Sequence, residues 1–86
     1  MLIHAASRLS GDSAARDRLR EAEIRANREL AAEGVILQSW RSEDRTKVFL
    51  ILEADNIDVA RSTLRRLPFV EYGVLVDFVF DEVVAL

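Results

Sequence analysis

The stretch Gly34–Glu53 constrains the fold of this chain more than any other part of it. It reads GVILQSWRSEDRTKVFLILE, two apolar runs rich in β-branched residues on either side of the polar segment Ser42–Arg45. Two such runs joined by a short polar connection are typical of a β-hairpin. We therefore predict strands at about 35–42 and 46–54. The second run is apolar on both faces, which indicates a central strand covered on both sides.

A helix is expected on each side of this hairpin. In the segment 14–33, apolar residues recur at spacings of three and four, as one face of a helix requires. These residues are Ala15, Leu19, Ala22, Ala26 and Leu30. Gly34 follows directly, and glycine is the residue that most easily adopts the left-handed conformation that ends a helix. A second, shorter helix is predicted over 57–66, and Pro68 is expected to stop it.

Strands at the two ends of the chain complete the pattern. Residues 1–9 and 70–80 are apolar and strand-like. The order strand, helix, strand, strand, helix, strand predicts a ferredoxin-like α+β fold, a four-stranded antiparallel βαββαβ sheet with two helices on one face. The other face of such a sheet would stay apolar and uncovered. We therefore expect a second copy to cover it, giving a homodimer or higher homo-oligomer of the dimeric α+β barrel type.

Composition excludes several classes of function. The 86 residues suit one domain, 1–86, and contain no cysteine, so neither a disulfide, nor a thiolate zinc site, nor a thiol nucleophile is possible. One histidine and no acidic loop argue against a metal site. The net charge of −3, with both signs interspersed, argues against nucleic acid. No apolar run approaches the roughly 20 residues of a membrane helix, and no signal peptide is recognisable, so a cytoplasmic protein is expected.

Glu23 is the acid that interrupts the apolar stripe of the first predicted helix. It lies four residues after Leu19 and three before Ala26, so it falls on or beside the buried face. Burial would raise the pKa of its carboxyl group, which suits a proton shuttle. Alternatively, Glu23 is a boundary residue paired with Arg20 or with the amide of Asn27.

Four further residues are candidates, each with a plainer alternative. His4, on the first strand, is either an acid-base group or a half-buried histidine bonded to a backbone carbonyl. Arg41 can hold a carboxylate and Trp40 can wall a pocket, or the two are a solvated arginine and a core tryptophan. Tyr72 can donate to a substrate carbonyl or pack in a dimer interface. Asp77 is a lesser candidate, which we expect to pair with an arginine.

Several short motifs together resemble the muconolactone isomerase family. They run over about residues 1–80 and are Met1-Leu2-Ile3-His4, Glu23, Glu29-Leu30, Gly34, Trp40-Arg41, Leu67-Pro68-Phe69 and Tyr72. The chain departs from the family in a shorter loop after the first strand. It also lacks the polar, basic ending of the family after Phe80.

The resemblance implies a cofactor-free isomerisation in aromatic catabolism that moves a double bond within an unsaturated lactone bearing a carboxylate. Such a reaction needs a base and acid, a donor to the enolate oxygen and a cation for the carboxylate. We assign the proton transfer to Glu23 or His4, the enolate bond to Tyr72, the carboxylate to Arg41 and a pocket wall to Trp40.

Two other functions are compatible with the same fold. The protein can be a cyclase or tailoring enzyme for a polyketide-like or aromatic intermediate, with a larger and more apolar pocket. It can also be a non-catalytic ligand-binding or assembly module. The last alternative predicts that Glu23 and His4 are exposed or fully paired, and that no cavity lies between helix and sheet.

Overall fold

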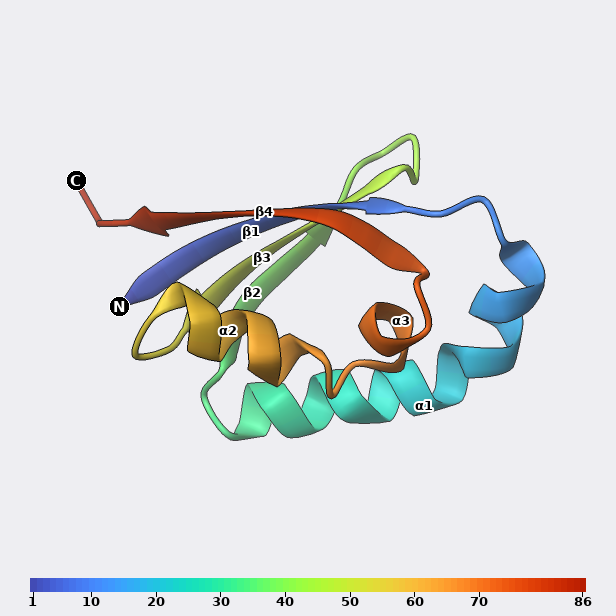
Figure 1. The fold of residues 1–86 in the computed structure, drawn as a ribbon, viewed down its shortest axis with the longest axis horizontal. Helices are drawn as coiled ribbons and strands as arrows, with labels where there is room; N and C mark the ends of the chain where they lie inside the picture. The colour runs from blue at the N-terminus through green and yellow to red at the C-terminus, as the bar shows by residue number, and fades with distance from the viewer.

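The chain folds into one antiparallel sheet with all its helices on one side (Figure 1). The computed structural model describes residues 1–86. Its elements are β1 (Leu2–Leu9), α1 (Ser13–Ala32), β2 (Ile36–Arg41), β3 (Lys47–Glu53), α2 (Ile57–Leu64), α3 (Pro68–Glu71) and β4 (Leu75–Val83). The strand order β2-β3-β1-β4, with every neighbouring pair antiparallel, is that of a ferredoxin-like fold. The predicted fold class is confirmed; the pairing of two sheets in a dimer stays a prediction.

The boundaries of α1 follow from its capping residues. The Asp12 side chain accepts a hydrogen bond from the Ala15 amide at 3.0 Å and so caps the first turn. At the other end, the amides of Gly34 and Val35 donate to the carbonyls of Ala31 and Leu30 at 3.1 and 2.9 Å. Gly34 has a φ of +79°, the left-handed conformation that this closing motif requires. The helix therefore ends where the sequence predicts, and the chain is free to enter β2.

In the last third of the chain, the end of the second helix and the start of the last strand differ from the prediction. The second helix ends at Leu64, and the predicted strand 70–80 begins only at Leu75. Pro68 does not simply stop a helix: it begins the short helix α3, a position where its fixed φ and missing N–H cost nothing. Val70, predicted to begin the last strand, therefore lies in α3, and Tyr72 directly follows that helix.

A second irregularity lies inside β4. Asp77 adopts a φ of +57°, and the pairing of β4 with β1 shifts register at this point. Such a bulge changes which residues face each side of the sheet. As a result, Phe78 and Phe80 pack towards the hydrophobic core, whereas Val76, which pairs with Arg8, lies on the other side of the sheet. Unbroken alternation would have placed these three side chains on one face.

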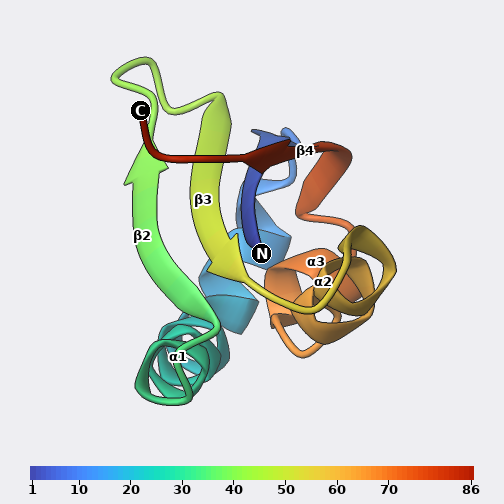
Figure 2. The same ribbon diagram turned by 90° about the vertical axis from the view of Figure 1, so that its left-hand side faces the viewer.

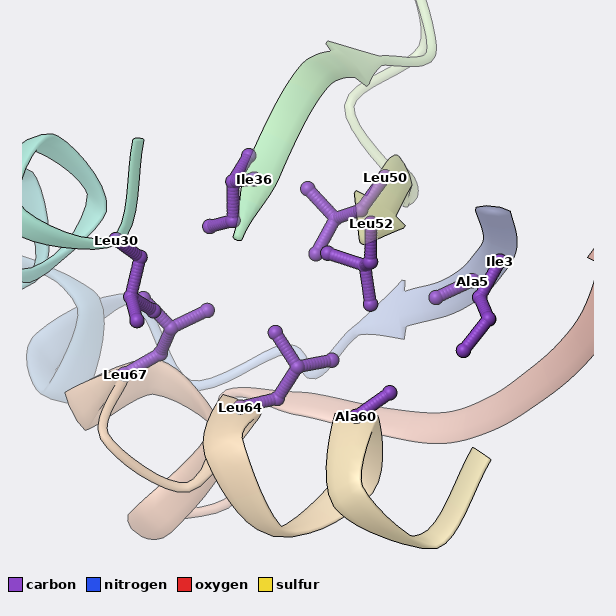
Figure 3. Close-up of a cluster of buried hydrophobic side chains, with 9 residues drawn as sticks. All are labelled: Ile3, Ala5, Leu30, Ile36, Leu50, Leu52, Ala60, Leu64 and Leu67. Carbon is purple, nitrogen blue, oxygen red and sulfur yellow. The ribbon is translucent and has the colours of Figure 1, made fainter. Parts of the chain in front are cut away.

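The sheet and the helices form two layers (Figure 2), and the hydrophobic core lies between them (Figure 3). Its nine buried residues are Ile3, Ala5, Leu30, Ile36, Leu50, Leu52, Ala60, Leu64 and Leu67. Glu23 is buried beside this core, whereas Ala22, which was predicted to be part of the buried stripe, is exposed. The helix is rotated so that Glu23 takes the inward position.

The opposite side of the sheet, here called the open face, has no helix over it (Figure 2). Strand alternation and register place on it Leu2, His4, Ala6, Trp40, Phe49, Ile51 and Val79, and towards its edges and ends the charged residues Arg8, Lys47, Glu53 and Asp81. Trp40 is 52% exposed and Val79 is 58% exposed. Only 14 of the 86 residues are buried, so a single chain leaves much of its apolar surface in water.

Candidate active-site cleft

The largest hollow in the molecule is a cleft of about 820 Å³ between α1 and the β2–β3 hairpin. It exists because α1 covers only the first part of β2: Ile36 is buried and the other five residues of that strand are exposed. The walls come from α1 on one side and from Ser39, Arg41 and Val48 on the other. Its size lies in the range of pockets that hold small organic ligands.

Glu23 contributes a buried carboxylate to this cleft, with a donor on each of its oxygens. Oε1 accepts a hydrogen bond from the backbone amide of Phe69 at 2.8 Å. Oε2 accepts one from the Asn27 side-chain amide at 2.9 Å, and the same amide group also bonds to the Glu23 carbonyl. The Glu23 side chain makes no ion pair, since Arg20 instead contacts Asp17 at 2.7 Å. Of the two partners considered from the sequence, the structure therefore selects Asn27.

The protonation of Glu23 reflects a balance between burial and hydrogen bonding. Burial raises the pKa of this carboxyl above its ordinary value of 4.5, and the bonds from Phe69 and Asn27 partly offset the rise. Each carboxylate oxygen keeps a lone pair beyond the bond it accepts. The group is thus fixed in position and still able to exchange a proton with a ligand in the cleft.

Arg41 and Trp40 are neighbours that the strand directs to different sides. Arg41 pairs with Val48, lines the cleft and makes no ion pair within the chain. Trp40 pairs with Phe49 and so projects to the open face, although part of it also borders the cleft. The cleft therefore brings together Glu23 and Arg41, with Trp40 at its rim.

His4 and Tyr72 lie outside the cleft of their own chain. His4 is on the open face, separated from Glu23 by the sheet, and its ring stacks on Phe49 with centroids 6.0 Å apart. Tyr72 directly follows helix α3 instead of lying in the predicted strand 70–80, and it is 66% exposed. The structure does not gather all five candidate residues into one site.

Two other contributions to the cleft can be recognised only from the structure. The amide of Phe69 reaches Glu23 from 46 residues away, which no local pattern indicates. Arg16 and Arg45 also line the cleft, from α1 and from the β2–β3 turn.

Asp77, the lesser candidate, lies outside the cleft. It forms an ion pair with Arg8 at 2.9 Å, the kind of partner that we expected. No group of three or more metal-binding side chains is present, and no helix is long and apolar enough to cross a membrane.

This geometry defines a ferredoxin-like α+β protein whose cleft holds one buried carboxylate beside unpaired arginines. Residues 3–81 match the family model described as muconolactone delta-isomerase. The chain therefore belongs to the muconolactone isomerase family. A comparison with curated protein sequences finds no significant match.

Two solved structures show the same fold at low sequence identity. One is the 5-chloro-2-hydroxyhydroquinone dehydrochlorinase of Burkholderia phenoliruptrix AC1100 in complex with 2,5-dihydroxybenzoquinone. It has a TM-score of 0.76 and 22% identity over 95% of this chain and 92% of that one. The other is a muconolactone isomerase, with a TM-score of 0.74 and 20% identity over 100% of this chain and 91% of that one.

Proposed function

We propose that this protein is a cofactor-independent isomerase that moves a carbon–carbon double bond in a small unsaturated lactone or related carboxylate by proton transfer. The observation that carries the proposal is Glu23, a buried carboxylate held by two donors in a cleft that also contains Arg41. Family membership supports the reaction class. A pKa raised towards neutrality makes Glu23 a more effective base than a solvated carboxylate.

The proposed reaction uses Glu23 as both base and acid. The carboxylate removes a proton from the carbon next to the lactone carbonyl or its vinylogue, and the C–H electrons pass into the conjugated enolate. The resulting carboxylic acid then returns a proton at the other end of the conjugated system, which restores the carboxylate and shifts the double bond. No net proton or electron is gained or lost.

Arg41 has the complementary role of holding the substrate's carboxylate. Its guanidinium is not engaged by an acid of the protein, and its planar donor array suits a carboxylate. Positioning the substrate in this way converts proton transfer into a step between groups already in contact. Trp40, at the rim, would exclude water from one end of the cleft.

The remaining two candidate residues enter the proposal only through a second copy of the chain. We propose that the open face packs against the same face of another copy, as its exposed tryptophan and valine favour. His4 and Tyr72 can contribute to a cleft only if a neighbouring copy supplies them. Within one chain, the residues with uncharged side-chain donors that line the cleft are Ser13, Asn27, Ser39 and Trp40.

A cyclase or tailoring enzyme is the second candidate function, favoured by the volume of the cleft. About 820 Å³ exceeds what a small lactone fills and suits a larger aromatic intermediate. The lining argues the other way, because 8 of its 18 residues are hydrophobic and four are arginines. The non-catalytic alternative predicts a paired or exposed Glu23, with which the two amide bonds agree, and no cavity between helix and sheet, against which the cleft counts.

The test is proton NMR of muconolactone and related butenolides in D2O with the purified protein. The proposal predicts deuterium incorporation with the wild type and its loss with Glu23→Gln, which keeps the size of the side chain. Equal exchange by both proteins would exclude Glu23 as the proton-transferring group. Absence of exchange with every lactone would reject the isomerase and favour the cyclase.

A further inference from the structure

We propose that Arg45, together with Arg16, forms a second anion-binding position in the cleft, so that the ligand carries two anionic groups. This inference rests on the proposed function only in taking Arg41 to bind the first carboxylate. It is carried by the backbone of Arg45, by the hydrogen bonds that hold its turn, and by the pairing of the charges around the cleft.

The backbone of Arg45 is the first observation. Its φ is +63°, and only one other non-glycine residue, Asp77, has a positive φ. Asp77 sits at a bulge and is held by an ion pair with Arg8. Arg45 is exposed and has no such partner. A turn position of this kind favours glycine or asparagine, so packing gives no reason for an arginine here. An unfavourable backbone state without a structural reason points to a functional one.

The turn around Arg45 is held firmly, which is the second observation. Asp44 Oδ1 accepts from the Ser42 hydroxyl at 2.7 Å, and from the hydroxyl and the amide of Thr46 at 2.7 and 3.1 Å. The Arg45 amide itself donates to the Ser42 carbonyl at 2.9 Å. The backbone of Arg45 is thus fixed, and its side chain lines the cleft from a rigid base.

The balance of charge around the cleft is the third observation. Four arginines and three acids line it, in a chain whose net charge is −3. Each acid is already engaged: Asp17 by Arg20, Asp44 by its own turn, and Glu23 by two amides. The three remaining arginines, Arg16, Arg41 and Arg45, make no ion pair. The cleft therefore offers more positive charge than one carboxylate neutralises.

The positions of these arginines indicate two separate binding points. Arg41 belongs to strand β2, Arg45 to the turn beyond its end, and Arg16 to the facing helix. A cleft of about 820 Å³ leaves room for a ligand that extends from one point to the other. The chemical class that fits is an unsaturated dicarboxylate or a lactone with a second acidic group.

The test compares two probes of equal carbon number, hexanedioate and hexanoate, by NMR titration of the ¹⁵N-labelled protein at constant ionic strength. We expect hexanedioate to bind about fivefold more tightly, the gain that exposed ion pairs can supply. Arg45→Asn should abolish this preference and leave hexanoate binding unchanged. The melting temperature of the variant should not fall, because asparagine tolerates a positive φ.

Three further variants make the result decisive. Arg45→Lys keeps the charge and should keep most of the preference. Arg41→Met should lower the affinity for both hexanedioate and hexanoate, which distinguishes the first binding point from the second. Arg18→Gln removes the same charge from an exposed arginine of α1 outside the cleft and should change nothing. Equal affinity of the two probes for the wild type, or a preference that survives Arg45→Asn, would overturn the proposal. So would a loss with Arg18→Gln as large as with Arg45→Asn. Because binding is measured without turnover, this outcome is independent of whether Glu23 transfers a proton.

Discussion

The two faces of the sheet each carry one residue suited to proton transfer, and they place it in different surroundings. On the helix side, Glu23 is buried, bonded to two amides and open to a cleft with Arg41. On the open face, His4 lies across the strands from Ile51 and Asp81, with its ring stacked on Phe49. The first setting tunes and positions a reactive group, whereas the second resembles a surface that another protein covers. The chemistry open to a chain like this therefore depends on which side of the sheet its helices cover.

The largest expected effect concerns stability, and it uses two neighbouring residues of β3. Leu52 is fully buried in the core, whereas Ile51 lies on the open face. Leu52→Ala should lower the free energy of unfolding by about 2–5 kcal/mol, since it removes packed atoms and leaves a cavity. Ile51→Ala should cost far less at low protein concentration, as urea unfolding would reveal. Similar losses in dilute solution would show that the open face is as well packed as the core.

A second prediction compares the effects on substrate binding of changing two residues of β2, one inside the cleft and one outside it. Arg41→Met should raise KM about 10- to 100-fold, because a charged hydrogen bond to the substrate's carboxylate is lost, with less effect on kcat. Steady-state kinetics on the lactone that shows exchange would measure both constants. Gln38→Met, which changes an exposed side chain of the same strand that does not line the cleft, is the matched control. An unchanged KM for Arg41→Met would remove Arg41 from the binding site.

The open face makes a separate prediction about self-association. Val79→Lys places a charge among apolar residues that we propose are covered by a second copy, so the variant should be monomeric where the wild type is not. Sedimentation velocity over a concentration series would measure this. Arg18→Gln, a charge change at an exposed position of α1 on the other side of the sheet, serves as the control. A wild type that stays monomeric at all concentrations contradicts the proposed dimer.

The smallest effects concern the pH dependence of stability, to which Glu23 and Asp44 contribute in opposite directions. The raised pKa of Glu23 stabilises the fold below its ordinary value of 4.5, and this contribution is lost as the pH rises through the raised pKa. Asp44 has a pKa of about 2, lowered from 3.8 mainly by the hydroxyl of Ser42. Its contribution is present above pH 3.8 and is lost as the pH falls towards 2.

The urea midpoint of unfolding should therefore depend on pH in opposite ways when the wild type is compared with Glu23→Gln and with Asp44→Asn. Relative to Glu23→Gln, the wild type should be favoured more at pH 4 than at pH 7. Relative to Asp44→Asn, it should be favoured more at pH 7 than at pH 2. Parallel curves for both variants would mean that the two carboxyl groups have similar surroundings.

Much of the fold could be predicted from the sequence because local signals agree with it. The hairpin, the long helix and its end at Gly34 all follow from periodicity and turn residues. The start of β4 could not, because Pro68 begins a helical turn as readily as it stops one, and because the bulge at Asp77 depends on the partner strand. Both features are determined by tertiary contacts, which a local sequence pattern does not show.

The site was only half predictable for a similar reason. Glu23 stands out because it breaks an apolar stripe, and that signal is local. On β1, however, the residues Leu2, His4 and Ala6 are about as apolar as Ile3, Ala5 and Ser7, so alternation alone does not say which set faces the helices. His4 is separated from Glu23 because Ile3 and Ala5 pack in the core on the helix side, which leaves His4 on the opposite face of the sheet.

The most direct test of the account compares Glu23→Gln with His4→Gln in the D2O exchange experiment, using the lactone on which the wild type is active. Loss of a general acid-base group lowers the rate by about 10²- to 10⁴-fold. We predict a loss of this size for Glu23→Gln and a much smaller one for His4→Gln, with both variants folded by circular dichroism. A full loss with His4→Gln and normal exchange with Glu23→Gln would place the chemistry on the open face and contradict the account.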